Sequence, residues 1–214
     1  MLKHFIEFGV KLGRARDGAA MLEFTIIALL LLLVTCGMVD FTLAFQQWNN
    51  ASKAAGLGAR LAAVSDPVAG PNGANNRYFS TLSATAAINI TCSGSTSACT
   101  GGGTYDSTAM NTIVFGRGKT ACSAVVTGQL PAMCNIFPGL TASKVTVNYN
   151  QPAYATSGLG LAGNAAGPTP TVTVAITGVT FSFYFLNSLL QLSPMSMPTM
   201  STTVTGEDLS TSGS

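Results

Sequence analysis

The feature that most constrains this chain is an apolar run near its N-terminus. From Phe24 to Val39, 16 consecutive residues carry no charge, and leucine is the commonest among them. With the largely apolar segments on either side, 19–22 and 41–45, the run exceeds the ~20 residues that a helix needs to cross a bilayer. The sequence therefore predicts a membrane-spanning helix.

Two acidic residues bracket this run. An acid placed inside hydrocarbon costs on the order of 2.5 to 3.5 kcal/mol. Asp40 can lie at the far membrane interface, but Glu23, next to the apolar run, needs another explanation. Cleavage after Gly18 would give Ala19 a new α-amine, which is positively charged near neutral pH. Because residues 19 and 23 share one face of a helix, the cut would turn an isolated acid into half of an ion pair.

These residues also form a recognisable motif. A glycine, an acid at the fifth position after it, an aromatic residue and a long apolar helix are the processing signature of type IV pilin-like precursors. Here the signature is Gly18, Glu23 and Phe24, and the Glu-Phe pair resembles the Flp and Tad (tight adherence) branch. Together with the sequences Gly37-Met38-Val39-Asp40-Phe41 and Gly58-Ala59-Arg60, the stretch from about residue 14 to 63 resembles the N-terminal region of TadE-like pilus assembly proteins.

The resemblance implies a structural function. It implies a minor pilin or pseudopilin of a Tad-type adhesive pilus, cut between Gly18 and Ala19 by a prepilin peptidase, with Glu23 and Phe24 as the processing and assembly motif. The implied partners are that peptidase, other pilin and pseudopilin subunits, the inner-membrane pilus assembly platform and membrane lipid.

The charges before the helix predict its orientation. Lys3, Lys11, Arg14 and Arg16 precede it, against only two acids, so the positive-inside rule places the N-terminus in the cytoplasm. We expect a cytoplasmic leader at 1–18, a transmembrane and emergent amphipathic helix at 19–63, and an extracytoplasmic domain at 64–214. The expected location is the bacterial inner membrane, with the C-terminal domain in the periplasm.

Beyond the membrane the helix pattern becomes one-sided. Apolar and small residues recur at helical spacing opposite a polar face, which predicts that one stripe docks onto the outer domain; the stripe is Phe41, Ala44, Phe45, Trp48, Ala51, Ala55, Gly58 and Ala62. Gly56 and Gly58 would each weaken a free helix by ~1 kcal/mol relative to alanine, and close backbone packing or the approaching end of the helix would explain them. Asp66-Pro67 and the following turn residues end the helix.

The rest of the chain has the pattern of short strands. Runs rich in Val, Ile, Thr and Tyr alternate with Gly and Ser loops, which predicts four or five antiparallel strands; the runs are 87–92, 123–127, 144–149, 171–176 and 179–185. The expected fold class is therefore α+β, with a long N-terminal membrane-spanning helix and a small antiparallel β-rich domain. From Gly206 onward we expect an exposed, frayed end.

Four cysteines follow the helix, and Cys36 lies within it. Cys92, Cys99, Cys122 and Cys134 form an even set in an oxidising compartment and predict two disulfides. Three pairings are open. We favour 92 with 99 and 122 with 134, because close pairs would fasten two loops in a domain with little core. A zinc site is the alternative, but the spacing is not C-x2-C and no histidine is near.

Residues 179–200 allow two interpretations. The uncharged stretch is long enough for a second membrane span. Interrupting polar residues and two prolines instead favour a strand that leads into a short helix, buried or facing a partner.

Composition limits the other functions. Only 8% of residues are charged and the net charge is +2, so no basic stripe predicts a nucleic-acid partner. His4 is the only histidine and lies in the leader, and the few outer acids are not paired, so we expect no enzyme, catalytic residue, metal or cofactor. The alternative function is a membrane- or lipid-anchored surface binding protein that is not part of a filament. Leu33-Val34-Thr35-Cys36 approaches the signature at which lipoproteins are cut and acylated.

Overall fold

The computed structural model describes residues 16–70, 79, 82, 87–125, 127–152, 170–191 and 193–206. The chain divides into two compact units. The first, called the helix unit below, comprises Met1–Phe45 and Ser182–Pro194; the second, called the β-domain, comprises Gln46–Phe181 and Met195–Ser214. Most of the expected leader lies outside the described residues, and so do residues 153–169, which make up most of the connection predicted from the sequence as a loop from Gln151 to Pro170. The expected boundaries at residues 18 and 63 stay a prediction.

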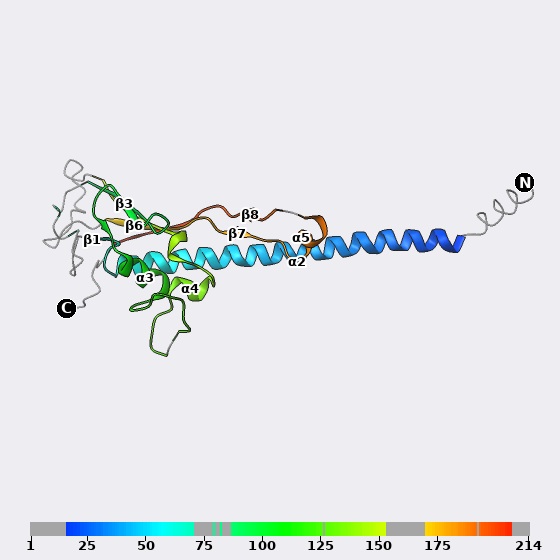
Figure 1. Cartoon of the computed structure of the whole chain (residues 1–214), viewed down its shortest axis with the longest axis horizontal. Helices are drawn as coiled ribbons and strands as arrows, with labels where there is room; N and C mark the ends of the chain where they lie inside the picture. Colours follow the sequence, from blue (N-terminus) through cyan, green and yellow to red (C-terminus); the bar gives the residue numbers. More distant parts are fainter. Residues whose placement is uncertain are drawn as a thin grey trace, which may run out of the picture. The chain divides into compact units, whose positions relative to one another are not determined.

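One long helix and an antiparallel sheet dominate the described elements (Figure 1). The helices are α2 (Arg16–Ala63), α3 (Ser107–Phe115), α4 (Met133–Ile136), the 3-10 helix η2 (Ala142–Lys144) and α5 (Phe185–Leu190). The strands are β1 (Ala69–Gly70), β2 (Ile88–Ser93), β3 (Ala98–Thr100), β4 (Thr104–Tyr105), β5 (Val145–Gln151), β6 (Thr171–Ile176), β7 (Thr180–Phe181), β8 (Met195–Ser196) and β9 (Met200–Thr205). The predicted α+β class is confirmed.

The main sheet has five antiparallel strands in the order β3-β2-β5-β6-β9. Strands β5 and β6 alternate between buried and less buried residues, as a sheet with one covered face requires. Val147 lies opposite Val174 and Tyr149 lies opposite Val172, so the buried faces of the two strands coincide. Two smaller pairs, β1-β4 and β7-β8, complete the described strands.

The end of α2 belongs to the β-domain core. Its buried positions are small residues, fully enclosed, at helical spacing: Ala51, Ala54, Ala55, Ala59 and Ala62. Small side chains let neighbouring elements approach the helix backbone closely. At Gly58 an added Cβ would clash with the Met133 side chain of α4, so close packing explains this glycine. Figure 1 shows α3 and α4 (green) beside the cyan part of α2.

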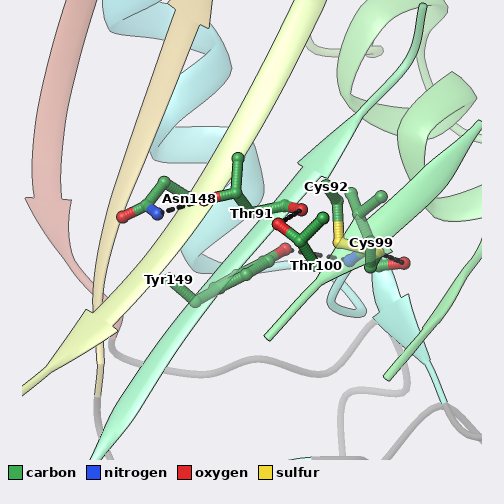
Figure 2. The surroundings of a disulfide bond; sticks show 7 residues. Thr91, Cys92, Cys99, Thr100, Asn148 and Tyr149 are labelled. Carbon is green, nitrogen blue, oxygen red and sulfur yellow. Dashed lines mark hydrogen bonds between the residues drawn. A yellow bond between two sulfur atoms is a disulfide. The ribbon is translucent and has the colours of Figure 1, made fainter. Parts of the chain in front are cut away.

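Two disulfides fasten the β-domain, and they are the pairing favoured by the cysteine spacing. Cys92 is bonded to Cys99, and Cys122 is bonded to Cys134. Figure 2 shows the first joining β2 to β3, where the two cysteines face each other in the ladder. On the neighbouring strand β5, the Asn148 side chain donates to the Thr91 hydroxyl at 2.7 Å, which ties β5 to β2 through side chains as well as backbone.

Tyr149 lies on the buried face of the sheet and contacts the segment that follows α2. Its hydroxyl accepts a hydrogen bond from the Val68 backbone N–H at 2.9 Å, and its ring packs 5.0 Å from that of Phe79. Val68 follows the end of α2, so this contact ties the helix exit to the sheet. A buried N–H without such an acceptor would destabilise the fold.

Several expectations about the elements were wrong. Residues 123–125 and 127 form no strand; they lie within the loop closed by the Cys122–Cys134 disulfide, where Val125 is exposed and pairs with none of the strands that the structure describes. The run 179–185 forms strand only at β7, and its end enters α5. Gly206, expected in the frayed end, is buried and donates its backbone N–H to the Pro170 carbonyl at 2.9 Å.

The stripe on α2 was predicted correctly only in part. It is buried from Ala51 onward, but Phe41, Phe45 and Trp48 are exposed. The physical reason is that the helix is enclosed by the β-domain only over its last turns. The expected end of α2 before Asp66-Pro67 is confirmed.

Candidate functional site

The surface of α2 in the helix unit is apolar and exposed. Large side chains from Met21 to Phe45 are mostly 47–72% exposed, leucines and isoleucines among them. The helix has a mean hydropathy of 2.4 over its most apolar window, and none of that window is buried. Within the described residues it is the one helix long and apolar enough to cross a membrane, judged by length and composition.

The hydroxyl groups on this surface are satisfied by the helix itself. Thr25 donates to the Met21 carbonyl at 2.6 Å, Thr35 donates to the Leu32 carbonyl at 2.9 Å, and Thr42 donates to the Met38 carbonyl at 2.8 Å. A hydroxyl bonded to its own helix needs no water partner. These threonines therefore do not interrupt a surface suited to lipid or to other apolar helices.

The predicted processing residues lie together at the start of α2. The described part of α2 begins at Arg16, so the Gly18–Ala19 bond lies within helical backbone, and both residues are exposed. Ala19 and Glu23 are one turn apart on a continuous helix, which places them on one face. Glu23 and Phe24 are exposed as well. Any group that acts on this motif therefore meets no obstacle from the described part of the chain.

Asp40 is the main feature that sequence reasoning missed. Its side chain is 0% exposed, and its two carboxylate oxygens accept four hydrogen bonds from three consecutive backbone N–H groups. The donors are Tyr184, Phe185 and Leu186, at distances from 2.8 to 3.3 Å. These N–H groups begin α5, where no donor has an intrahelical partner. Asp40 thus caps a helix 144 residues further along the chain.

Apolar contacts accompany this cap. The rings of Phe41 and Phe183 meet edge to face with centroids 6.0 Å apart. Leu186 is only 8% exposed, and its Cδ1 lies 4.0 Å from where a Cβ on Gly37 would be. A Cβ at position 37 would be in ordinary van der Waals contact with Leu186, so this side chain lies against the Gly37 face of α2. We call Asp40 together with residues 183–186 the Asp40 clasp (Figure 1, orange α5 beside blue α2).

The sequence held one signal for the clasp. An acid at the end of an apolar span needs donors, and a helix N-terminus supplies them. The sequence could not predict which helix supplies the donors, because residues 40 and 184 are 144 positions apart and no local pattern relates them.

The β-domain carries a groove of about 420 Å³ between the end of α2, the end of α3 and the Cys122–Cys134 loop. Val64, Val125 and Leu130 line it and are exposed, and Arg117 and Lys119 lie on its wall. The groove therefore presents positive charge beside apolar side chains. Across the described residues, no group of three or more His, Cys, Asp or Glu is placed to hold a metal ion.

Comparison with known families bears on the helix. The family model described as TadE-like protein matches residues 18–60. This segment is TadE-like. The resemblance inferred from Gly18, Glu23 and Phe24 is confirmed, and the match also contains Asp40. The TadE-like segment ends just before α2 does, so the β-domain sheet lies outside it. No curated protein and no solved structure matches the chain significantly.

Proposed function

We propose that this protein is a minor pilin or pseudopilin of a Tad-type adhesive pilus, processed by a prepilin peptidase after Gly18. The observation that carries the proposal is the TadE-like match over residues 18–60, on a helix whose apolar surface is uncovered. The family implies membership of a pilus assembly system with other pilus components. The protein acts by packing and not as an enzyme.

The mechanism follows from two alternative environments of one helix. In the bilayer, lipid covers the exposed side chains between Met21 and Phe45. In a filament, the same side chains pack against helices of neighbouring subunits. Cleavage after Gly18 gives Ala19 an ammonium group one turn from Glu23 on the same helix. Glu23 can then pair with the ammonium group of its own or of a neighbouring subunit. A pair buried among apolar helices would fix their axial register.

The charges that precede the helix support an orientation. The basic leader stays in the cytoplasm under the positive-inside rule. The β-domain then lies in the periplasm, where its two disulfides persist.

Substitution of Glu23 tests the assembly mechanism. We expect Glu23→Ala and Glu23→Gln to retain membrane insertion but to abolish or strongly reduce pilus formation, because neither side chain carries the negative charge of the proposed ion pair with the Ala19 ammonium group. Thr25→Val is the matched control, since the Thr25 hydroxyl bonds only within its own helix. Pilus yield is measured by shearing cells and quantifying the major subunit. Normal piliation in the Glu23 variants would contradict the proposal.

A further inference from the structure

The Asp40 clasp fixes the level of α5 along α2. Its contacts are with Gly37, Asp40 and Phe41, which fall within two turns of one another. A hydrocarbon core of about 30 Å takes ~20 helical residues. Counted from Ala19, such a span ends at Met38; counted from Phe24, it ends at Leu43. Both counts place α5 at the far boundary of the span.

The clasp also supplies the hydrogen bonds that the Asp40 carboxylate would otherwise take from water. A carboxylate at the edge of a span normally requires hydration or a cation. Asp40 has four backbone hydrogen bonds and no exposed surface. The surroundings of Asp40 on α2 are apolar and exposed: Met38, Val39 and Phe41. Lipid can therefore contact α2 past Asp40.

The outer side of the clasp has the composition of a membrane interface. Tyr184 is 65% exposed and Phe185 is 50% exposed. No charged residue occurs between Val145 and Gly206. Placing residues 183–190 at the edge of the hydrocarbon therefore brings no charged side chain of this part of the sequence into lipid. Aromatic side chains, tyrosine especially, are favoured where the hydrocarbon meets the headgroups.

From these observations we infer that residues 183–190 are an interfacial membrane anchor, with Tyr184 and Phe185 inserted in lipid at the end of the α2 span. The inference rests on the membrane helix of the proposed function. The α5 segment does not cross the bilayer. It lies at the boundary of the hydrocarbon and attaches Ser182–Pro194, the second segment of the helix unit, to the same lipid that surrounds α2. Lipid is the occupant because the clasp holds Tyr184 and Phe185 beside the apolar surface of α2, which contacts lipid in the proposed function.

Depth-dependent quenching of a fluorescent label tests the anchor. The full chain carries Cys36→Ala, so that a single introduced cysteine is labelled without reduction of the disulfides. Labels are placed at Phe185→Cys, at Ile27→Cys in the middle of the span, and at Ser201→Cys on exposed β9. Each protein is reconstituted in phosphatidylcholine and phosphatidylglycerol vesicles that contain a nitroxide either near the headgroup or near the acyl-chain end.

We expect the label at Phe185 to be quenched at least about twofold more by the headgroup-proximal nitroxide than by the deep one, as a probe at the boundary of the hydrocarbon should be. The label at Ile27 should show the reverse order, and the label at Ser201 should show little quenching. Asp40→Ala should lower the quenching at Phe185 and leave Ile27 unchanged. The quenching at Phe185 should not depend on the protein-to-lipid ratio.

The failures are distinguishable. If Phe185 behaves like Ser201 while Ile27 is deeply quenched, the anchor is wrong and the membrane helix stands. If quenching at Phe185 disappears as the protein-to-lipid ratio rises, a second copy covers the clasp and lipid is the wrong occupant. If Ile27 is not quenched, the proposed membrane helix fails, and the anchor fails with it.

Discussion

At the scale of single residues, two buried polar side chains determine how distant parts of the chain are joined. Asp40 satisfies the first N–H groups of α5, and Tyr149 satisfies the N–H of Val68. Each replaces bonds that water would otherwise make, so each is costly to remove although its net contribution is modest. Neither contact is encoded in nearby sequence.

Removal of the Asp40 carboxylate should loosen α5. In Asp40→Ala the N–H groups of residues 184–186 lose their acceptors, and an unsatisfied buried donor costs about 1–3 kcal/mol. Asp40→Asn keeps one acceptor oxygen and should give an intermediate effect. Hydrogen exchange of these amides, followed by mass spectrometry in detergent, measures the change. Thr42→Ala, which loses only a bond within α2, is the control. Unchanged exchange in Asp40→Ala would show that the cap contributes nothing.

Tyr149 should make the β-domain sensitive to alkali. Burial raises the pKa of Tyr149 well above its usual 10.0, although the hydrogen bond from Val68 opposes this, and burial followed by the charge of Asp106 raises the pKa of Tyr105. The folded state keeps these phenols protonated at a pH where the unfolded chain releases the protons. Stability is therefore fully present below about pH 10 and falls as pH rises above it.

The variant Tyr149→Phe separates the two contributions. At neutral pH it should lose about 1–3 kcal/mol, because the Val68 N–H has no acceptor. Above pH 10 its stability should fall less steeply than that of the parent, with the remaining slope due to Tyr105. Denaturant unfolding across this pH range measures both effects. Tyr184→Phe, at an exposed position, should leave neutral-pH stability unchanged. An identical alkaline slope in parent and Tyr149→Phe would refute the assignment.

At the scale of elements, periodicity predicted what is local and missed what depends on partners. The uncharged run from Phe24 to Val39 predicted α2, and the alternation in β5 and β6 predicted those strands. Helix α3 was not predicted, although Asp106, which accepts hydrogen bonds from the N–H groups of Thr108 and Ala109, is a residue type that commonly caps a helix start. Residues 123–125 carry a strand-like pattern but pair with none of the described strands, and a pattern alone cannot supply a partner strand.

Two glycines on α2 give a matched test of close packing. An alanine at position 58 would displace the fully buried Met133 side chain, and overpacking of this kind costs about 1–3 kcal/mol. Nothing lies within 4 Å of a Cβ at Gly56, so Gly56→Ala should instead stabilise the helix by up to about 1 kcal/mol. Thermal unfolding compares them. In a double-mutant cycle, Gly58→Ala and Met133→Ala together should cost less than the sum of their separate losses. Equal stability of the two glycine variants would exclude a special fit at position 58.

At the scale of the whole molecule, the helix unit and the β-domain have different requirements. The helix unit exposes apolar side chains and needs lipid or other helices, whereas the β-domain has its own core and two disulfides. The spacing of the cysteines favoured the observed pairing. The TadE-like resemblance was predictable because its motif, Gly18, Glu23 and Phe24, is contiguous. The Asp40 clasp was not predictable, because it depends on how the chain returns to α2.

The Cys122–Cys134 disulfide should stabilise the β-domain through its loop. Closure of a loop of this length is worth about 3 kcal/mol in the chain-entropy model. Replacement of both cysteines by alanine should therefore lower the midpoint of denaturant unfolding, while Cys36→Ala, which breaks no disulfide, should not. A midpoint unaffected by loss of the pair would mean that the loop is held by its other contacts.

The N-terminal residue of the mature protein tests the central claim most directly. Mass spectrometry of protein isolated from cells with and without prepilin peptidase identifies it. The proposed function predicts Ala19 at the N-terminus when the peptidase is present and the intact leader when it is absent. A mature chain that begins at an acylated Cys36, or that retains Met1 in the presence of the peptidase, would contradict the assignment as a pilus subunit.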